Sequence, residues 1–318
     1  MRVRRFLPSR LFAAFGGFML AVSAGGPALA SPPQAGRPDP VALATEGRNL
    51  SVHGKLNEAL ARYQQALALD PKLFDAHYGA GLVLDLQGHY TRARQELTSA
   101  IALAPPGARD LALEAMGVSY AFQADAAGAA VYYRRLFDRQ LERGNLDGAA
   151  GTANALGRVY LESGDPAHAR EWYRRGYDTA MRQTGLDARA VALWKFRLAH
   201  ADGRIAVRRG DVAAARRAVA TAKAIVDSPI GADQKPDYEY LVGYVDFYAG
   251  EYPAAIAALR QANQKDAFIL GLLAQAFEKT GDLARAREYY AKVLTVNAHD
   301  LQDAFARPLA EKRLAALK

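Results

Sequence analysis

The 318-residue sequence contains no cysteine. This absence excludes disulfides, thiolate-bound metals, a cysteine nucleophile and the lipid-modified cysteine of a bacterial lipoprotein. Packing and other noncovalent contacts must therefore supply all of the stability. Beyond the first 30 residues the sequence also lacks any apolar run of the roughly 20 residues that a membrane-spanning helix needs. We therefore expect no membrane span in that part of the chain.

The common catalytic and nucleotide-binding motifs are also missing. The sequence has no Gly-x-Ser-x-Gly elbow, no phosphate-binding Gly-x-x-x-x-Gly-Lys and no His-Glu-x-x-His. No two of the six histidines lie three or four residues apart, so no helix face offers a pair of metal ligands. We predict that the protein is not an enzyme and that it uses no catalytic residue, no metal and no cofactor.

Residues 1–30 have the three parts of a secretory signal peptide. Four arginines lie within the first ten residues, an apolar stretch runs from 11 to about 24, and Ala28-Leu29-Ala30 fits a cleavage site. We predict cleavage after Ala30 and a periplasmic or secreted mature protein. A retained membrane anchor is the alternative, but the apolar stretch is short for a spanning helix. Arg4-Arg5 leaves both Sec and twin-arginine export open.

The formal net charge of +8 would suggest a nucleic-acid partner if the whole chain were retained. Removing the four arginines of the signal peptide from the 41 basic residues leaves about +4 against the 33 acidic ones. This value is ordinary for a soluble protein, and export separates the protein from cytosolic nucleic acid. We therefore expect no nucleic-acid partner.

Two regions follow the signal peptide. Residues 31–40 contain four prolines and are predicted to form a stiff, extended linker. From residue 41 the sequence repeats: a shift of 34 residues superposes small or helix-breaking residues on one another. The superposed pairs are Gly47 and Gly81, Gly54 and Gly88, Ala59 and Ala93, Ala66 and Ala100, and Pro71 and Pro105.

The repeated unit resembles the tetratricopeptide repeat, in which a helix, a turn and a second helix form each module. Its clearest copy reads Leu156-Gly157-x-x-Tyr160, then Gly164-Asp165-Pro166, then Ala169-x-x-x-Tyr173. The resemblance implies an all-α, right-handed superhelical solenoid of about seven helix-turn-helix repeats over 41–300. A capping helix over 301–318 would then close the array, since terminal repeats need a polar outer face.

Small residues at fixed positions allow the paired helices to approach closely, because larger side chains would overpack the contact. The two weaker copies of the repeat have Ala124 in place of the turn glycine and Asp246 in place of an aromatic residue. Intervals longer than 34 residues predict longer helices or loops in the middle of the array. The predicted structural positions are Gly47, Ala59, Gly81, Ala93, Gly117, Ala129, Gly157, Ala169, Gly203, Ala215, Gly243, Ala255, Ala274 and Ala286.

In proteins of this family the first helix of each repeat lines a concave groove, and carrying its inward positions over predicts a basic strip that leads to aromatic residues. Arginine and tyrosine are common where binding energy is concentrated. The alternative is that the tyrosines are packing residues and the arginines ordinary surface charge. The predicted groove residues are Asn154, Arg158, Arg197, His200, Arg204, Arg208, Tyr240, Tyr244 and Phe247.

The resemblance implies a non-enzymatic scaffold or adaptor of the bacterial cell envelope, which binds a partner polypeptide in this groove. A peptide with acidic groups and an apolar anchor would suit the strip. Ala44 and Arg48 occupy the positions with which chaperone-tail-binding members hold a terminal carboxylate, so that function is not expected. Two alternatives stay open: a solenoid that binds glycan or cell-wall ligands through its tyrosines, and a structural part of an envelope secretion or pilus assembly. The sequence leaves the oligomeric state open.

Overall fold

The structure is a computed structural model that describes residues 38–317. Within this range all regular secondary structure is helical, and no helix is long and apolar enough to cross a bilayer. The helices are α1 (Pro40–Val52), α2 (Leu56–Leu69), α3 (Phe74–Leu86), α4 (Tyr90–Leu103), α5 (Arg109–Ala121), α6 (Ala126–Glu142), α7 (Leu146–Glu162), α8 (Pro166–Met181), α9 (Ala188–Arg208), α10 (Val212–Val226), η1 (Ala232–Gln234), α11 (Lys235–Tyr248), α12 (Tyr252–Leu259), α13 (Ala267–Lys279), α14 (Leu283–Val293) and α15 (Leu301–Ala316).

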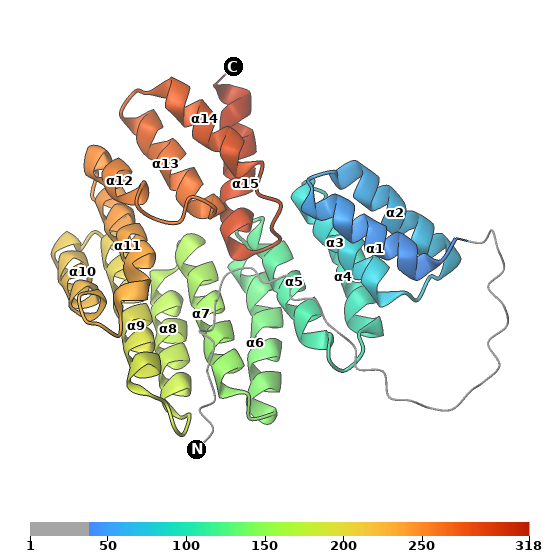
Figure 1. The fold of residues 1–318 in the computed structure, drawn as a ribbon, viewed down its shortest axis with the longest axis horizontal. Helices are drawn as coiled ribbons and strands as arrows, with labels where there is room; N and C mark the ends of the chain where they lie inside the picture. The colour runs from blue at the N-terminus through green and yellow to red at the C-terminus, as the bar shows by residue number, and fades with distance from the viewer. Residues whose placement is uncertain (1–37, 318) are drawn as a thin grey trace.

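The helices from α1 to α14 form consecutive pairs, and each pair packs against the next along the chain (Figure 1). The fold is an all-α solenoid of helical repeats. The middle of the array has longer helices than its start, as the spacing predicts: α9 has 21 residues, whereas α3 has 13. These long helices deepen the part of the solenoid that holds the predicted groove residues.

Close helix contacts explain the repeated small residues. A Cβ atom on Gly157 would lie 2.9 Å from the Tyr173 ring, and one on Gly243 would lie 2.5 Å from Leu259. Both distances are shorter than a normal carbon contact, so only glycine fits without movement of the facing side chain. The second-helix alanines Ala59, Ala93, Ala129, Ala169, Ala215, Ala255 and Ala286 are all fully buried.

In the turns within the pairs, one residue ends the first helix and the residues after it begin the second. Gly164 has a φ of +92°, which ends α7 in the left-handed region that glycine tolerates. Asp165 then caps α8 by accepting a hydrogen bond from the His168 N–H at 3.1 Å, and Pro166 occupies the first turn. Ala124 occupies the equivalent turn position after α5 and keeps a φ of +53° without the freedom of glycine.

Helix α1 begins at the last residue of the predicted linker (31–40). Pro40 is the first residue of α1, and the Asp39 side chain caps that helix by accepting a hydrogen bond from the Val41 N–H at 3.0 Å. A proline at this position is tolerated because its missing N–H would have no partner in the helix. The predicted signal peptide (1–30) and residues 31–37 of the predicted linker lie outside the described residues.

Helix α15 does more than cover the last pair. It packs against α13 and α14, and it also contacts α5 and α7 from much earlier in the chain (Figure 1). Leu301 and Ala304 belong to the same buried cluster as Phe122 and Leu86. The C-terminal segment therefore closes the curved array against its first half.

Candidate functional site

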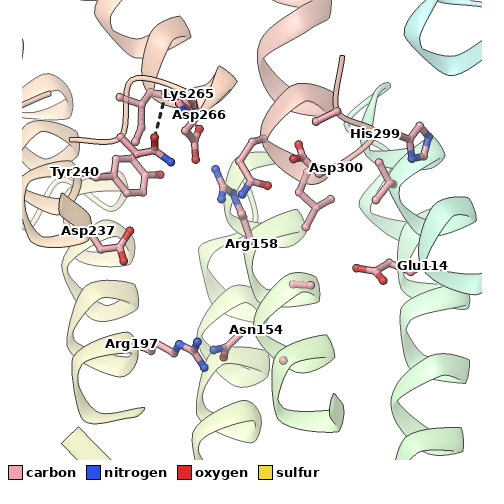
Figure 2. Close-up of a pocket in the computed structure, with 18 of the residues that line it drawn as sticks. Glu114, Asn154, Arg158, Arg197, Asp237, Tyr240, Lys265, Asp266, His299 and Asp300 are labelled. Atoms are coloured by element: carbon pink, nitrogen blue, oxygen red, sulfur yellow. Dashed lines mark hydrogen bonds between the residues drawn. The ribbon is translucent and has the colours of Figure 1, made fainter. Parts of the chain in front are cut away.

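A cavity of about 2210 Å³ lies at the centre of the curved array. First helices of successive repeats line it, namely α3, α5, α7, α9 and α11, and the loops that precede α13 and α15 complete the wall. Figure 2 shows side chains from these separate elements pointing toward one space. The cavity exists because the C-terminal segment approaches α5 and encloses what would otherwise be an open concave face.

The structure places six of the nine predicted groove residues on this cavity and three elsewhere. The six come from α7, α9 and α11, and whether they contact a partner is part of the proposal below. They are Asn154, Arg158, Arg197, His200, Arg204 and Tyr240.

Arg158 of α7 reaches into the middle of the cavity between Asp266 and Asp300 (Figure 2). Among the residues that the structure describes, its side chain has no hydrogen-bond or ion-pair partner, and its Nε and Nη2 atoms are buried. The guanidinium lies 4.9 Å from the centre of the Phe268 ring. An arginine stays charged in a protein, so this position holds a partly buried, unpaired cation.

Asp266 lies close to Arg158 and also begins α13. Its carboxylate accepts hydrogen bonds from the N–H groups of Phe268 and Ile269 at 2.8 and 3.1 Å, which caps the helix. Burial raises the pKa of Asp266 to about 6, although the nearby Arg158 acts to lower it. At neutral pH Asp266 is therefore mostly ionised.

An ion-pair network lies below the cavity. The side chain of Glu162 is only 4% exposed and pairs with Arg208 at 3.0 Å and with Arg204 at 3.8 Å. Arg204 also donates to the Tyr173 hydroxyl at 2.8 Å, and the Tyr244 hydroxyl donates to Glu162 at 3.2 Å. The network ties α7, α8, α9 and α11 together at one level.

Arg208, Tyr244 and Phe247 do not line the cavity. Tyr244 is fully buried beneath Arg208 and Glu162, and Phe247 is buried in the cluster that joins α11 to its neighbours. The guanidinium of Arg208 pairs within the network and donates to the Tyr244 and Tyr248 hydroxyls. These contacts favour a packing role for the three side chains, and their part in partner binding stays a prediction.

The cavity wall above the network carries both signs of charge. Arg197 and Asn154 face one another across the lower wall, and Asp237 lies above Arg197 (Figure 2). Burial raises the pKa of Asp237, and Arg197 partly opposes this effect. Burial lowers the pKa of His200 well below its ordinary value, and the charges of Arg204 and Arg158 add to that effect, so His200 is neutral at pH 7.

The sequence patterns did not indicate that Glu162, Asp266 and Tyr173 lie beside the site. Glu162 is the last residue of α7 and looks like an ordinary polar residue before a turn. Asp266 follows an irregular segment, but its position directly before an apolar helix is a recognisable capping signal. Their approach to Arg158 and Arg204 depends on the curvature of the array, which local patterns do not specify.

No arrangement typical of a metal site is present in residues 38–317, since no three His, Asp or Glu side chains converge there. The wall instead provides hydrogen-bond donors, carboxylates and apolar side chains. Side chains of these kinds can bind a ligand through hydrogen bonds, ion pairs and apolar contacts.

Comparison with known proteins agrees with this architecture. Two family models match, one described as TPR repeat over residues 53–88 and one as Tetratricopeptide repeat over 240–300. No curated protein matches the chain. No catalytic family is indicated.

Two solved structures are similar to this chain to different degrees. A tetratricopeptide repeat protein from Parabacteroides merdae is 13% identical, and the match covers 87% of this chain and 98% of that one with a TM-score of 0.53. PilF from Pseudomonas aeruginosa is 17% identical over 80% of this chain and 97% of that one, with a TM-score of 0.45. The helix pairs, their repeated small residues and the matching family models together show that the chain contains tetratricopeptide repeats, and such repeats generally mediate protein–protein interaction.

Proposed function

We propose that this chain is an exported, non-enzymatic scaffold or adaptor of the bacterial cell envelope that binds a partner polypeptide in its central cavity. The size of the cavity is the observation that supports this most strongly. At about 2210 Å³ it exceeds the roughly 300–1,000 Å³ typical of small-molecule sites. A polypeptide segment is the kind of ligand that would use so much space.

The lining offers a polypeptide both apolar and charged contacts. Leu111 of α5 and Ile230, just before η1, line the cavity and are 51% and 42% exposed. Large aliphatic side chains of this kind gain free energy when a partner covers them, at about 25 cal/mol per Å² of apolar area. Arg158 and Arg197 would contact acidic groups of the same partner. The expected partner is therefore a polypeptide with an apolar anchor and acidic residues.

The location in the cell envelope rests on the sequence of residues 1–30. A basic start, an apolar stretch and a small-residue cleavage site favour export, and the absence of cysteine means that an oxidising compartment would not alter the fold.

The glycan-binding alternative has less support at the cavity, because among Tyr240, Tyr244 and Tyr248 only Tyr248 is exposed, at 38%, and it does not line the cavity. It depended on aromatic faces that can stack on sugar rings, but Tyr244 is fully buried and Tyr240 is 6% exposed. A ring in that position cannot receive a sugar on its face.

Site-specific photo-crosslinking tests the proposal. A benzophenone amino acid replaces Leu111 or Ile230 in the exported protein, and Val131 of α6 serves as the control, since it is 54% exposed but does not line the cavity. Illumination of cells should attach one discrete polypeptide at both cavity positions and not at Val131. Equal labelling from Val131, or no polypeptide adduct at either cavity position, would contradict the proposal.

A further inference from the structure

Four side chains on the floor of the cavity have buried polar atoms without a hydrogen-bond partner among residues 38–317. The atoms are Nε and Nη2 of Arg158, Nε of Arg204, Nε2 of His200 and the hydroxyl of Tyr240. His200, Arg204 and Tyr240 are each more than nine-tenths buried. A buried polar group without a partner costs about 1–3 kcal/mol, so four at one place require an explanation.

These four side chains form one patch. The His200 and Tyr240 rings lie 5.2 Å apart, and the Arg204 guanidinium is 5.9 Å from the centre of the Tyr240 ring. Arg158 and Tyr240 both approach Phe268, at 4.9 and 6.3 Å from its ring centre. We call these four residues the floor patch; it is formed by α7, α9 and α11.

The floor patch itself carries positive charge. Arg158 and Arg204 are cations, and His200 is neutral at pH 7. Burying a charged group away from water is costly unless the group gains partners, so the unpartnered donors of Arg158 and Arg204 favour a ligand group that carries negative charge and accepts hydrogen bonds.

Carboxylates of the cavity wall limit how much negative charge a ligand can bring. Asp266 and Asp300 lie on either side of Arg158, and Asp237 and Glu114 lie farther along the wall (Figure 2). A doubly charged phosphate would meet stronger repulsion from these carboxylates than a group with a single negative charge. The floor patch therefore favours a ligand group with one negative charge.

We propose that the floor patch binds the side-chain carboxylate of one glutamate or aspartate of a polypeptide that occupies the cavity. A planar carboxylate can accept two hydrogen bonds from the Arg158 guanidinium and further ones from Arg204 and Tyr240. The floor patch is deeply buried, so a slender side chain reaches it more readily than a chain terminus with its own backbone and side chain. That the ligand is a polypeptide rests on the proposed function, whereas the preference for one carboxylate does not.

Three N-acetylated dipeptides distinguish a side-chain carboxylate from a terminal one. N-acetyl-Glu-Phe-amide carries a side-chain carboxylate, N-acetyl-Gln-Phe-amide is its neutral analogue, and N-acetyl-Gln-Phe with a free terminus carries only a terminal carboxylate. Each is titrated into the mature protein at constant ionic strength and followed by the NMR signal of the Arg158 Nε–H, with inorganic phosphate as a fourth probe. The Glu peptide should bind at least about tenfold more tightly than the other three and should move that signal.

Variants assign the effect to Arg158. Isothermal titration calorimetry measures the variants, because they lack the Arg158 Nε–H. Arg158→Met should abolish the preference for Glu over Gln, and Arg158→Lys should weaken it because an ammonium cannot make the two-pronged contact. Arg189→Met is the matched control, since Arg189 also lines the cavity but already pairs with Asp233 at 2.6 Å. The control should bind the Glu peptide as the unmodified protein does. Because Arg158 makes no hydrogen bond within the described residues, Arg158→Met should stay folded, which its melting curve checks.

Any of three results would overturn the inference. They are equal binding of the Glu and Gln peptides, tighter binding of the terminal carboxylate than of the side-chain one, and an unchanged preference in Arg158→Met. These failures are distinct from failure of the proposed function, because crosslinking at Leu111 reports polypeptide binding whether or not a carboxylate reaches Arg158. Conversely, the dipeptides can bind the floor patch even if no polypeptide is captured in cells.

Discussion

The His299 ring nitrogen Nε2 lies 2.8 Å from the Asp85 carboxylate, although the two residues are 214 positions apart in the chain. Both side chains are almost fully buried, and the second oxygen of Asp85 accepts a hydrogen bond from Ser119 at 2.9 Å. The His299 ring also packs on Phe122 at 5.6 Å. This contact joins the segment before α15 to α3 and α5 and encloses the central cavity.

Replacing His299 should therefore weaken the contact that holds the segment before α15 against α3 and α5. We expect His299→Ala to lower the free energy of unfolding by about 3 kcal/mol, because it leaves the buried Asp85 carboxylate with fewer partners. Urea denaturation measures the loss, and hydrogen exchange should rise around residues 294–300. His168→Ala is the control: it removes a pair of the same type with Asp165, but that pair is exposed and should contribute less than about 1 kcal/mol. Equal losses of unfolding free energy in the two variants would contradict a special role for the contact between His299 and Asp85.

Glu162 should stabilise the network below the cavity by its charge rather than by its shape. Glu162→Gln keeps a hydrogen-bonding group for Tyr244 but leaves Arg204 and Arg208 without a counter-charge. Breaking a buried ion pair in this way should cost about 3 kcal/mol in urea denaturation. Glu288→Gln, which affects an exposed pair with Lys292, should change stability far less. A loss from Glu162→Gln no larger than that of the control would count against the network.

The stability of the protein should depend on pH through Asp303 of α15. Burial raises the pKa of Asp303 to about 7, although Arg307, which donates to it at 3.0 Å, acts to lower it. Nearby Asp300 and Glu311 add to the increase. Because the folded state binds the proton more tightly than the unfolded state, this contribution is fully present below the unfolded pKa of about 4 and is lost as pH rises through about 7.

Comparison with Asp303→Asn isolates this effect, because other titrating groups are common to both proteins. The difference in unfolding free energy between the unmodified protein and Asp303→Asn should change by roughly 4 kcal/mol between about pH 4 and pH 8, in favour of the unmodified protein at low pH. Urea denaturation across this range provides the measurement. A difference that stays constant, or that changes in the opposite direction, would exclude a raised pKa at Asp303.

Local features of the fold could be predicted from sequence, and long-range ones could not. Gly157 and Ala169 belong to one helix pair, so their spacing reports directly on the contact between neighbouring helices. The contact of His299 with Asp85 depends on the summed curvature of all repeats between them, which no local pattern encodes. The same reason explains why only one of the two predicted groove tyrosines lines the cavity. Tyr240 lines it, whereas Tyr244, one helical turn later, lies under the ion-pair network.

Ala124 offers a test of the argument that this turn position favours glycine. It holds a φ of +53°, where a residue with a Cβ atom is strained by about 1–2 kcal/mol. Ala124→Gly should remove this strain and, after the greater freedom of glycine in the unfolded chain is subtracted, stabilise the protein by about 0.5–1 kcal/mol. Gly164→Ala at the equivalent turn should have the opposite sign, since nothing lies within 4 Å of the added Cβ and only its φ of +92° opposes it. Thermal unfolding of both variants tests the pair, and two shifts of the same sign would refute the argument.

The strongest test of the helix-pair register compares two alanines on the same helix. Ala169 of α8 is fully buried, whereas Ala167 on the same helix is exposed. Alanine and leucine have similar helix propensities, so Ala→Leu at either position changes packing far more than helix formation. We expect Ala169→Leu to lose about 1–3 kcal/mol in urea denaturation because the larger side chain forces α8 away from its neighbours, and Ala167→Leu to change stability by less than about 0.5 kcal/mol. Since an equivalent alanine recurs in each of the seven pairs, equal stability of the two variants would mean that these small residues do not set the distance between the helices, and the explanation of the whole repeat pattern would fail with it.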